Sequence, residues 1–187
     1  MPKRVVLSHL LTRSFSARQH CRALLLLGHL SLLVLAVFSL LFYRERMLHF
    51  DTANYVYHLI YFQDFYTGHD RYISYLPQLL PLLAARAGWS LPLVLQVYSL
   101  SFILLYYLIY LLIVYGFRNV QGGLFLVLAL TLTLRYKFYA PVGEVVISIA
   151  FVVLVLGLLS SEWYVRTGQR ALKIGIAMFF SALMIFV

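Results

Sequence analysis

Four residues of the segment 51–58 have side chains and a spacing that could bind and activate a substrate. Asp51, Asn54, Tyr55 and His58 follow one another at helical intervals, which places them on one face of a helix. A carboxylate on such a polar stripe could act as a general base toward a bound acceptor, if its pKa and geometry suit. Asp51 is therefore the candidate catalytic residue, and the other three are candidate substrate-binding residues.

Two histidines near Asp51 raise the question of a metal site. His49 and His58 could supply ligands together with Asp51, although the spacing matches none of the strong zinc patterns. No cofactor follows with certainty, and a divalent metal stays one alternative. For the other acids of this region, Asp64 and Asp70, the alternative to a functional role is that they are simply solvated.

A second charged cluster flanks a turn expected at residues 136–143. Arg135 precedes this turn, Lys137 lies at its start and Glu144 follows it. Two cations of this kind would hold a lipid phosphate, so all three are candidate substrate-binding residues. The alternatives are that Glu144 is an acid favoured by a helix N-terminus and that the two cations extend toward lipid headgroups.

The composition defines the class of protein that positions these residues. Of the 187 residues, 63% are apolar or aromatic and 11% are charged, which excludes an ordinary soluble domain and a disordered chain. We therefore expect an all-α integral membrane protein. The net charge of +9 could attract nucleic acid, but basic residues beside apolar segments are more simply explained as topology signals. The single cysteine, Cys21, cannot form a disulfide within the chain.

Apolar segments of about 20 residues can cross a bilayer as helices, and the chain contains several candidates. We expect a basic leader at 1–22, membrane spans at 23–43, 93–115, 124–134 and 145–159, a polar loop at 160–173, and the start of a further span at 174–187. The third and fourth spans are short and should form a tight hairpin. The glycines of 116–123 predict a turn before it. Because the last apolar segment is too short to cross, we expect this chain to be the N-terminal part of a larger polytopic protein.

The charges around the first span predict its orientation. Five basic residues and no acid precede it, so the N-terminus should be cytoplasmic and the loop 44–92 external. His29 is the only ionisable group within this span and could stay neutral. In the external loop, 51–58 should be an amphipathic helix in the membrane interface, and 75–87, interrupted by prolines, should not cross. The expected architecture is a polytopic helical bundle in the cell, or inner, membrane.

Three stretches carry a resemblance to a known family. They are Leu48-His-Phe-Asp51-Thr-Ala-Asn-Tyr55, Tyr75-Leu-Pro-Gln-Leu-Leu-Pro81 and Gly88-Trp-Ser90 before a long span. Over residues 23–160 the chain resembles the GT-C membrane glycosyltransferases, most closely the protein mannosyltransferase and lipid A aminoarabinose transferase branch. Many members have paired acids where this chain has Asp51 followed by Thr52.

The resemblance implies a transfer reaction at the external membrane face. Such enzymes move a sugar from a polyprenyl-phosphate carrier to an acceptor, and Asp51 occupies the place of the family's acceptor-activating carboxylate. The implied partners are membrane lipids and the polyprenyl-phosphate sugar. No motif points to nucleic acid, and the oligomeric state is left open.

Two other functions compete with a transferase. One is a transporter or channel component, although the spans carry few of the ionisable residues that mark ion pathways. The other is a small structural or assembly protein of the membrane without catalysis. Continuation of the reading frame into further spans would favour the transferase over the structural protein.

Overall fold

The computed structural model describes residues 3–68, 72–142, 144–161, 174–175 and 178. The all-α class is confirmed, since the regular elements of this part of the chain are all helical. They are α1 (Lys3–Leu41), α2 (Tyr43–Met47), α3 (Phe50–Tyr61), η2 (Tyr72–Ser74), α4 (Tyr75–Arg86), α5 (Leu91–Leu111), η3 (Leu112–Gly116), α6 (Val120–Lys137) and α7 (Glu144–Leu159). Most of the expected loop 160–173 and of the expected span 174–187 lies outside the described residues.

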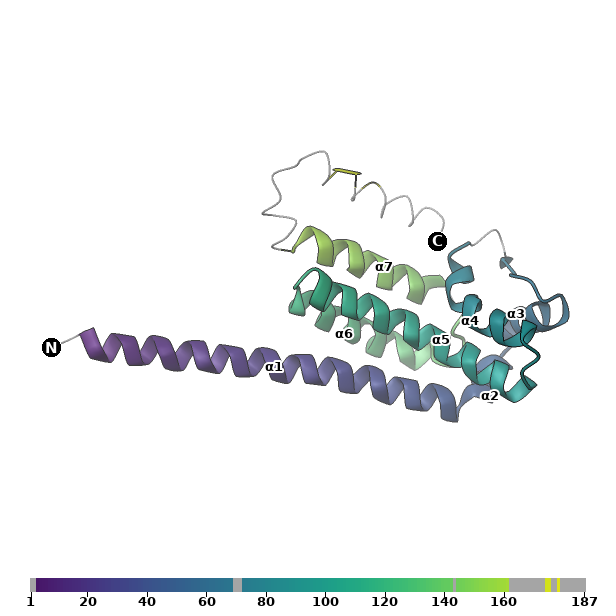
Figure 1. Cartoon of the computed structure of the whole chain (residues 1–187), viewed down its shortest axis with the longest axis horizontal. Coiled ribbons are helices and arrows are strands. Elements are labelled where there is room, and N and C mark those ends of the chain that lie inside the picture. The colour runs from purple at the N-terminus through teal and green to yellow at the C-terminus, as the bar shows by residue number, and fades with distance from the viewer. Residues whose placement is uncertain (1–2, 69–71, 143, 162–173, 176–177, 179–187) are drawn as a thin grey trace.

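The long helices form a bundle with a group of short helices at one end (Figure 1). α1 has 39 residues and is about 58 Å long at 1.5 Å per residue. The helices α5, α6 and α7 lie beside its C-terminal half, whereas its N-terminal half projects beyond them (Figure 1). We call the short helices α2, α3, η2 and α4, with the loops that join them, the cap (residues 43–90).

Hydrogen bonds between side chains and backbone fix the register of α1 against α5. The Ser99 hydroxyl donates to the Ser39 carbonyl at 2.7 Å, and the Tyr110 hydroxyl donates to the Leu25 carbonyl at 3.2 Å. The two helices are therefore antiparallel. Because Ser99 lies level with the end of α1, the first two turns of α5 extend past that end into the cap.

α4 packs along this extension of α5. The Ser101 hydroxyl donates to the Pro77 carbonyl at 2.6 Å, so the start of α4 lies level with the end of α1. From there α4 runs away from the bundle, and residues 87–90 turn the chain back into α5. Its 12 residues extend about 18 Å, less than the roughly 30 Å of a bilayer's hydrocarbon layer.

α6 and α7 form an antiparallel hairpin whose open end is held by Asn119. The Asn119 amide donates to the Gly157 carbonyl at 3.1 Å and to the Ser160 hydroxyl at 2.8 Å. Its oxygen accepts from the Gly122 N–H at 2.8 Å, as a helix N-cap does. The turn expected at 116–123 is therefore shorter than the sequence suggested, since α6 already begins at Val120.

Gly123 explains why glycine stands inside the first turn of α6. A Cβ at this position would overlap the side chain of Val114 and lie 3.1 Å from the Tyr110 ring. The glycine therefore serves the close approach of α6 to η3, and not the backbone freedom of a loop.

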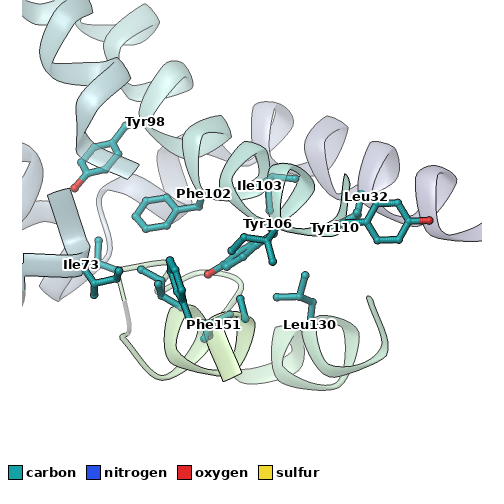
Figure 2. Close-up of a cluster of buried hydrophobic side chains, with 14 of the residues drawn as sticks. Leu32, Ile73, Tyr98, Phe102, Ile103, Tyr106, Tyr110, Leu130 and Phe151 are labelled. Atoms are coloured by element: carbon teal, nitrogen blue, oxygen red, sulfur yellow. The ribbon is translucent and has the colours of Figure 1, made fainter. Parts of the chain in front are cut away.

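The core lies between the four long helices. Figure 2 shows Leu32 of α1, Phe102, Ile103 and Tyr106 of α5, Leu130 of α6 and Phe151 of α7 gathered in one cluster with Ile73 of η2. All of these side chains are buried. The core therefore continues from the bundle into the cap through η2.

Two helical segments are long and apolar enough to cross a membrane by length and composition, Arg22–Leu41 and Leu91–Gly116. They correspond to the spans expected at 23–43 and 93–115. Two shorter apolar segments, Val120–Thr133 and Val146–Leu159, correspond to the expected hairpin. One face of α1 is left open, with Leu26, Leu30 and Leu33 exposed by 58–69%.

Candidate functional site

The start of α3 places Asp51 at the surface of the cap. His49 has an extended backbone and lies immediately before α3, so Asp51 lies in the first turn of this helix. Positions 52, 55, 56 and 59 form the buried face of α3, at the helical spacing of a packed face. Asp51 and Asn54 lie off that face and are exposed.

The polar stripe of α3 is divided between the surface and the interior. Asn54 donates from Nδ2 to the Tyr66 hydroxyl at 3.3 Å, and the His58 ring stacks on the Tyr66 ring at 4.0 Å with an interplanar angle of 8°. Tyr55 is 6% exposed, and its hydroxyl accepts the Gly68 N–H at 3.2 Å. The expectation that Tyr55 shares the open face is wrong, because its ring belongs to the packed face of the helix.

A loop that the sequence did not single out completes this surface. Gln78, fully buried on α4, donates from Nε2 to the Tyr66 carbonyl at 2.8 Å and accepts the Tyr66 N–H at Oε1 at 2.9 Å. Arg86 donates from Nε and Nη2 to the Gln63 carbonyl at 3.0 and 2.9 Å. Tyr66 is therefore held from behind while its ring faces His58 and Asn54.

The Asp51 carboxylate is open to a ligand. In the part of the chain that the structure describes, it makes no hydrogen bond and no ion pair, and it lies in the first turn of α3. By contrast, Asp64 in the same cap is engaged, since its Oδ1 accepts the Phe65 N–H at 2.8 Å.

The possible metal site at His49, Asp51 and His58 is not assembled. Among the described residues, no three side chains of His, Cys, Asp or Glu come together as metal ligands would. Asp70 lies outside those residues.

The second charged cluster is at the same end of the bundle as the cap. Arg135 and Lys137 lie in the last turn of α6, and Glu144 begins α7. The loop between these helices contacts the cap and the end of α1, where Phe138 packs on Arg46 and Tyr139 on Phe42. The side chains of the three charged residues are themselves outside the described part of the structure.

The most unusual charged residue is Arg46, which the sequence analysis did not single out. It lies on α2 and is 1% exposed. Its Nε donates to the Ser99 hydroxyl at 2.9 Å and its Nη2 to the Ser99 carbonyl at 3.4 Å. The Phe138 ring covers the guanidinium at 4.3 Å. Arg46 therefore joins α2, α5 and the α6–α7 loop.

Burial makes the charge of Arg46 costly. It lowers the pKa of Arg46 to about 10, and the guanidinium is still protonated at neutral pH. Taking a charged group out of water costs several kcal/mol when no opposite charge compensates, and no described carboxylate contacts it. The available sequence signal was the pair of serines, Ser99 and Ser101, within an otherwise apolar helix.

An apolar groove of about 460 Å³ lies between α4 and α5. Its lining includes Leu80, Leu83, Trp89, Leu100 and Leu104 and no charged side chain. The groove can accept hydrocarbon but offers no group for chemistry.

Comparison with known proteins gives no relative. No family model, no curated protein and no solved structure matches this chain. The function of these residues is therefore inferred from their chemistry and their positions in the structure.

Proposed function

We propose that this chain belongs to a membrane glycosyltransferase that moves a sugar from a polyprenyl-phosphate carrier to an acceptor at the external membrane face. The observation that carries the proposal is Asp51, an exposed carboxylate without a partner among the described residues, on a cap that sits at one end of an apolar helical bundle. The turn that bears Arg135, Lys137 and Glu144 lies at this same end, which supports binding of the carrier's phosphate there.

The proposed membrane placement follows the apolar helices. Arg22–Leu41 and Leu91–Gly116 cross the bilayer, and the two shorter apolar helices cross as a hairpin. The N-terminus is cytoplasmic, since the basic leader has no acid, and the cap is external. The exposed leucines of α1 then face lipid.

In the proposed reaction Asp51 is the general base. It takes the proton of an acceptor hydroxyl as that oxygen attacks the anomeric carbon of the sugar. The bond between the anomeric carbon and the phosphate oxygen breaks, and the carrier leaves as polyprenyl phosphate. Asn54, His58 and the Tyr66 hydroxyl that Asn54 contacts line the surface on which the acceptor or the sugar binds.

The test replaces Asp51 with asparagine in the full-length protein. Asp51→Asn keeps the size and most of the hydrogen bonding of the side chain but cannot accept the proton. We expect transfer from a polyprenyl-phosphate sugar to fall by about 10²–10⁴-fold, the usual contribution of a general base, with expression and membrane insertion unchanged.

Asp64→Asn is the matched control, because this acid lies in the same cap and accepts the N–H of the next residue, Phe65. It should retain transfer near the wild-type rate. Wild-type turnover in Asp51→Asn, or an equal loss in Asp64→Asn, would reject the proposal. Insertion without any transfer by the wild-type protein would favour a structural or transport-related membrane protein.

A further inference from the structure

A small cavity adjoins the buried guanidinium of Arg46. It holds about 20 Å³, which is room for about one water molecule or one atom of similar size. Arg46, Tyr106 and Thr133 are its polar lining residues, and Leu35, Phe102 and Phe138 are among the apolar ones. The cavity therefore lies where α1, α2, α5 and α6 meet.

Arg46 has more donors than its neighbours use. A guanidinium carries five N–H groups, and two of them are bonded to Ser99, which leaves three. Among the described residues no acceptor reaches these three. The Thr133 hydroxyl donates to the Ala129 carbonyl at 2.6 Å, so it has no hydrogen left to donate to a ligand in the cavity.

The buried positive charge of Arg46 favours an anion as the occupant of the cavity. A water molecule could accept from the free N–H groups, but it would leave the positive charge uncompensated in a largely apolar surround. An anionic atom satisfies the donors and the charge together, and charge-assisted hydrogen bonds are the strongest that a guanidinium makes. The size of the cavity limits the occupant to a single atom, such as a halide or one oxygen of a phosphate group.

We propose that Arg46 and this cavity form a binding site for one anionic atom at the cap end of the bundle. The atom comes from a phosphate group of a lipid or from a free small anion. The site lies just past the end of α1, which in the proposed membrane placement is the depth of the lipid headgroups. The inference concerns binding and holds independently of the proposed transferase activity.

The test measures thermal unfolding of the purified chain in a detergent without phosphate. One arm exchanges chloride for gluconate at constant ionic strength, because chloride enters the cavity whole whereas the polyol chain of gluconate has to stay outside it. The other arm adds phosphatidic acid or, as its matched control, diacylglycerol. Stabilisation by chloride over gluconate identifies a free anion, and stabilisation by phosphatidic acid over diacylglycerol identifies a lipid phosphate. No difference in either arm overturns the proposal.

The variant Arg46→Met removes the charge while filling most of the space of the side chain. We expect the half-saturating concentration of the effective anion to rise by about 10–100-fold, the equivalent of one lost hydrogen bond to a charged group. Arg44→Met is the control, because Arg44 is exposed on the same helix and donates to the hydroxyl of its neighbour Tyr43. An equal response in wild type and Arg46→Met, or an equal loss in Arg44→Met, overturns the proposal.

Two further variants keep the test decisive. If Arg46→Met does not fold, Arg46→Lys retains a cation and should respond more weakly than wild type, whereas an unchanged response contradicts the site. Glu144→Gln asks whether the chain's own acid is the anion. If added anions do not stabilise the wild type, and Glu144→Gln lowers its stability, the anion next to Arg46 is the Glu144 carboxylate of the chain itself, and the proposal of an external anion is overturned.

Discussion

The two ends of the α1–α5 pair each hold an ionisable side chain, but under opposite conditions. At the cap end Arg46 is buried, charged and supplied with more donors than acceptors. At the other end His29 is half-buried, and its Nδ1 and Nε2 lie 3.1 and 2.9 Å from the hydroxyls of Tyr107 and Tyr115. The Tyr110 ring meets the imidazole edge-on at 5.2 Å.

The comparison of His29 with Arg46 shows how a polar side chain that stabilises the fold differs from one that can bind a ligand. A neutral imidazole has one donor and one acceptor, and a tyrosine hydroxyl can play either role, so the His29 cluster is complete without another molecule. A guanidinium has donors only. Arg46 therefore needs acceptors that its described neighbours do not supply, and it has a cavity in which to receive one.

The largest expected effect is all-or-none and tests whether the two ends lie on opposite sides of a membrane. Asp64→Cys and Gln121→Cys, each made after Cys21→Ser, introduce exposed thiols at the cap and at the start of α6. In intact cells an impermeant maleimide should label position 64 and leave position 121 unlabelled, because the proposed topology places the basic leader and the start of α6 on the cytoplasmic side. Labelling of position 121 alone would invert the proposed topology.

The next effect concerns the Arg46 end. Ser99→Ala removes the acceptor of the Arg46 Nε–H and the bond to the Ser39 carbonyl. We expect the free energy of unfolding to fall by about 1.5–3 kcal/mol, since a hydrogen bond to a charged group is lost. Denaturation in mixed micelles measures it.

Ser101→Ala is the control for that change, because Ser101 is also buried on α5 but its partners among the described residues are neutral carbonyls. Its loss should be about 1 kcal/mol. Equal losses at the two serines would mean that Arg46 does not depend on Ser99.

The smallest effect belongs to the His29 end. Tyr107→Phe removes one hydroxyl and keeps the ring that contacts His29 at 5.8 Å. Hydrogen bonds between apolar membrane helices contribute about 0.6 kcal/mol on average, so the free energy of unfolding should fall by about that amount. The same denaturation assay measures it, and adding Tyr115→Phe should roughly double the loss. A loss larger than that of Ser99→Ala would reverse the comparison between the two ends.

The candidate site followed from the sequence only in part. Asp51 was expected at the start of a helix with an open carboxylate, and α3 begins one residue before it. This succeeded because exposure in the first turn of an amphipathic helix is a local property. Tyr55 was assigned to the same open face, and the structure buries it. A tyrosine next to a polar stripe can be exposed or buried. Tyr55 is buried because α3 packs on α4 and because the Gly68 N–H donates to its hydroxyl.

The sequence by itself determined the helical class and the approximate limits of the apolar helices. A single apolar run of about 20 residues can satisfy all its backbone hydrogen bonds within itself in an apolar surround only as a helix. Only the tertiary structure decided that Arg46 is buried and His29 is satisfied. Their partners Ser99, Phe138, Tyr107 and Tyr115 lie between 53 and 92 residues away along the chain. Burial and hydrogen bonding of a side chain depend on which helices meet, and no local pattern of residues contains that information.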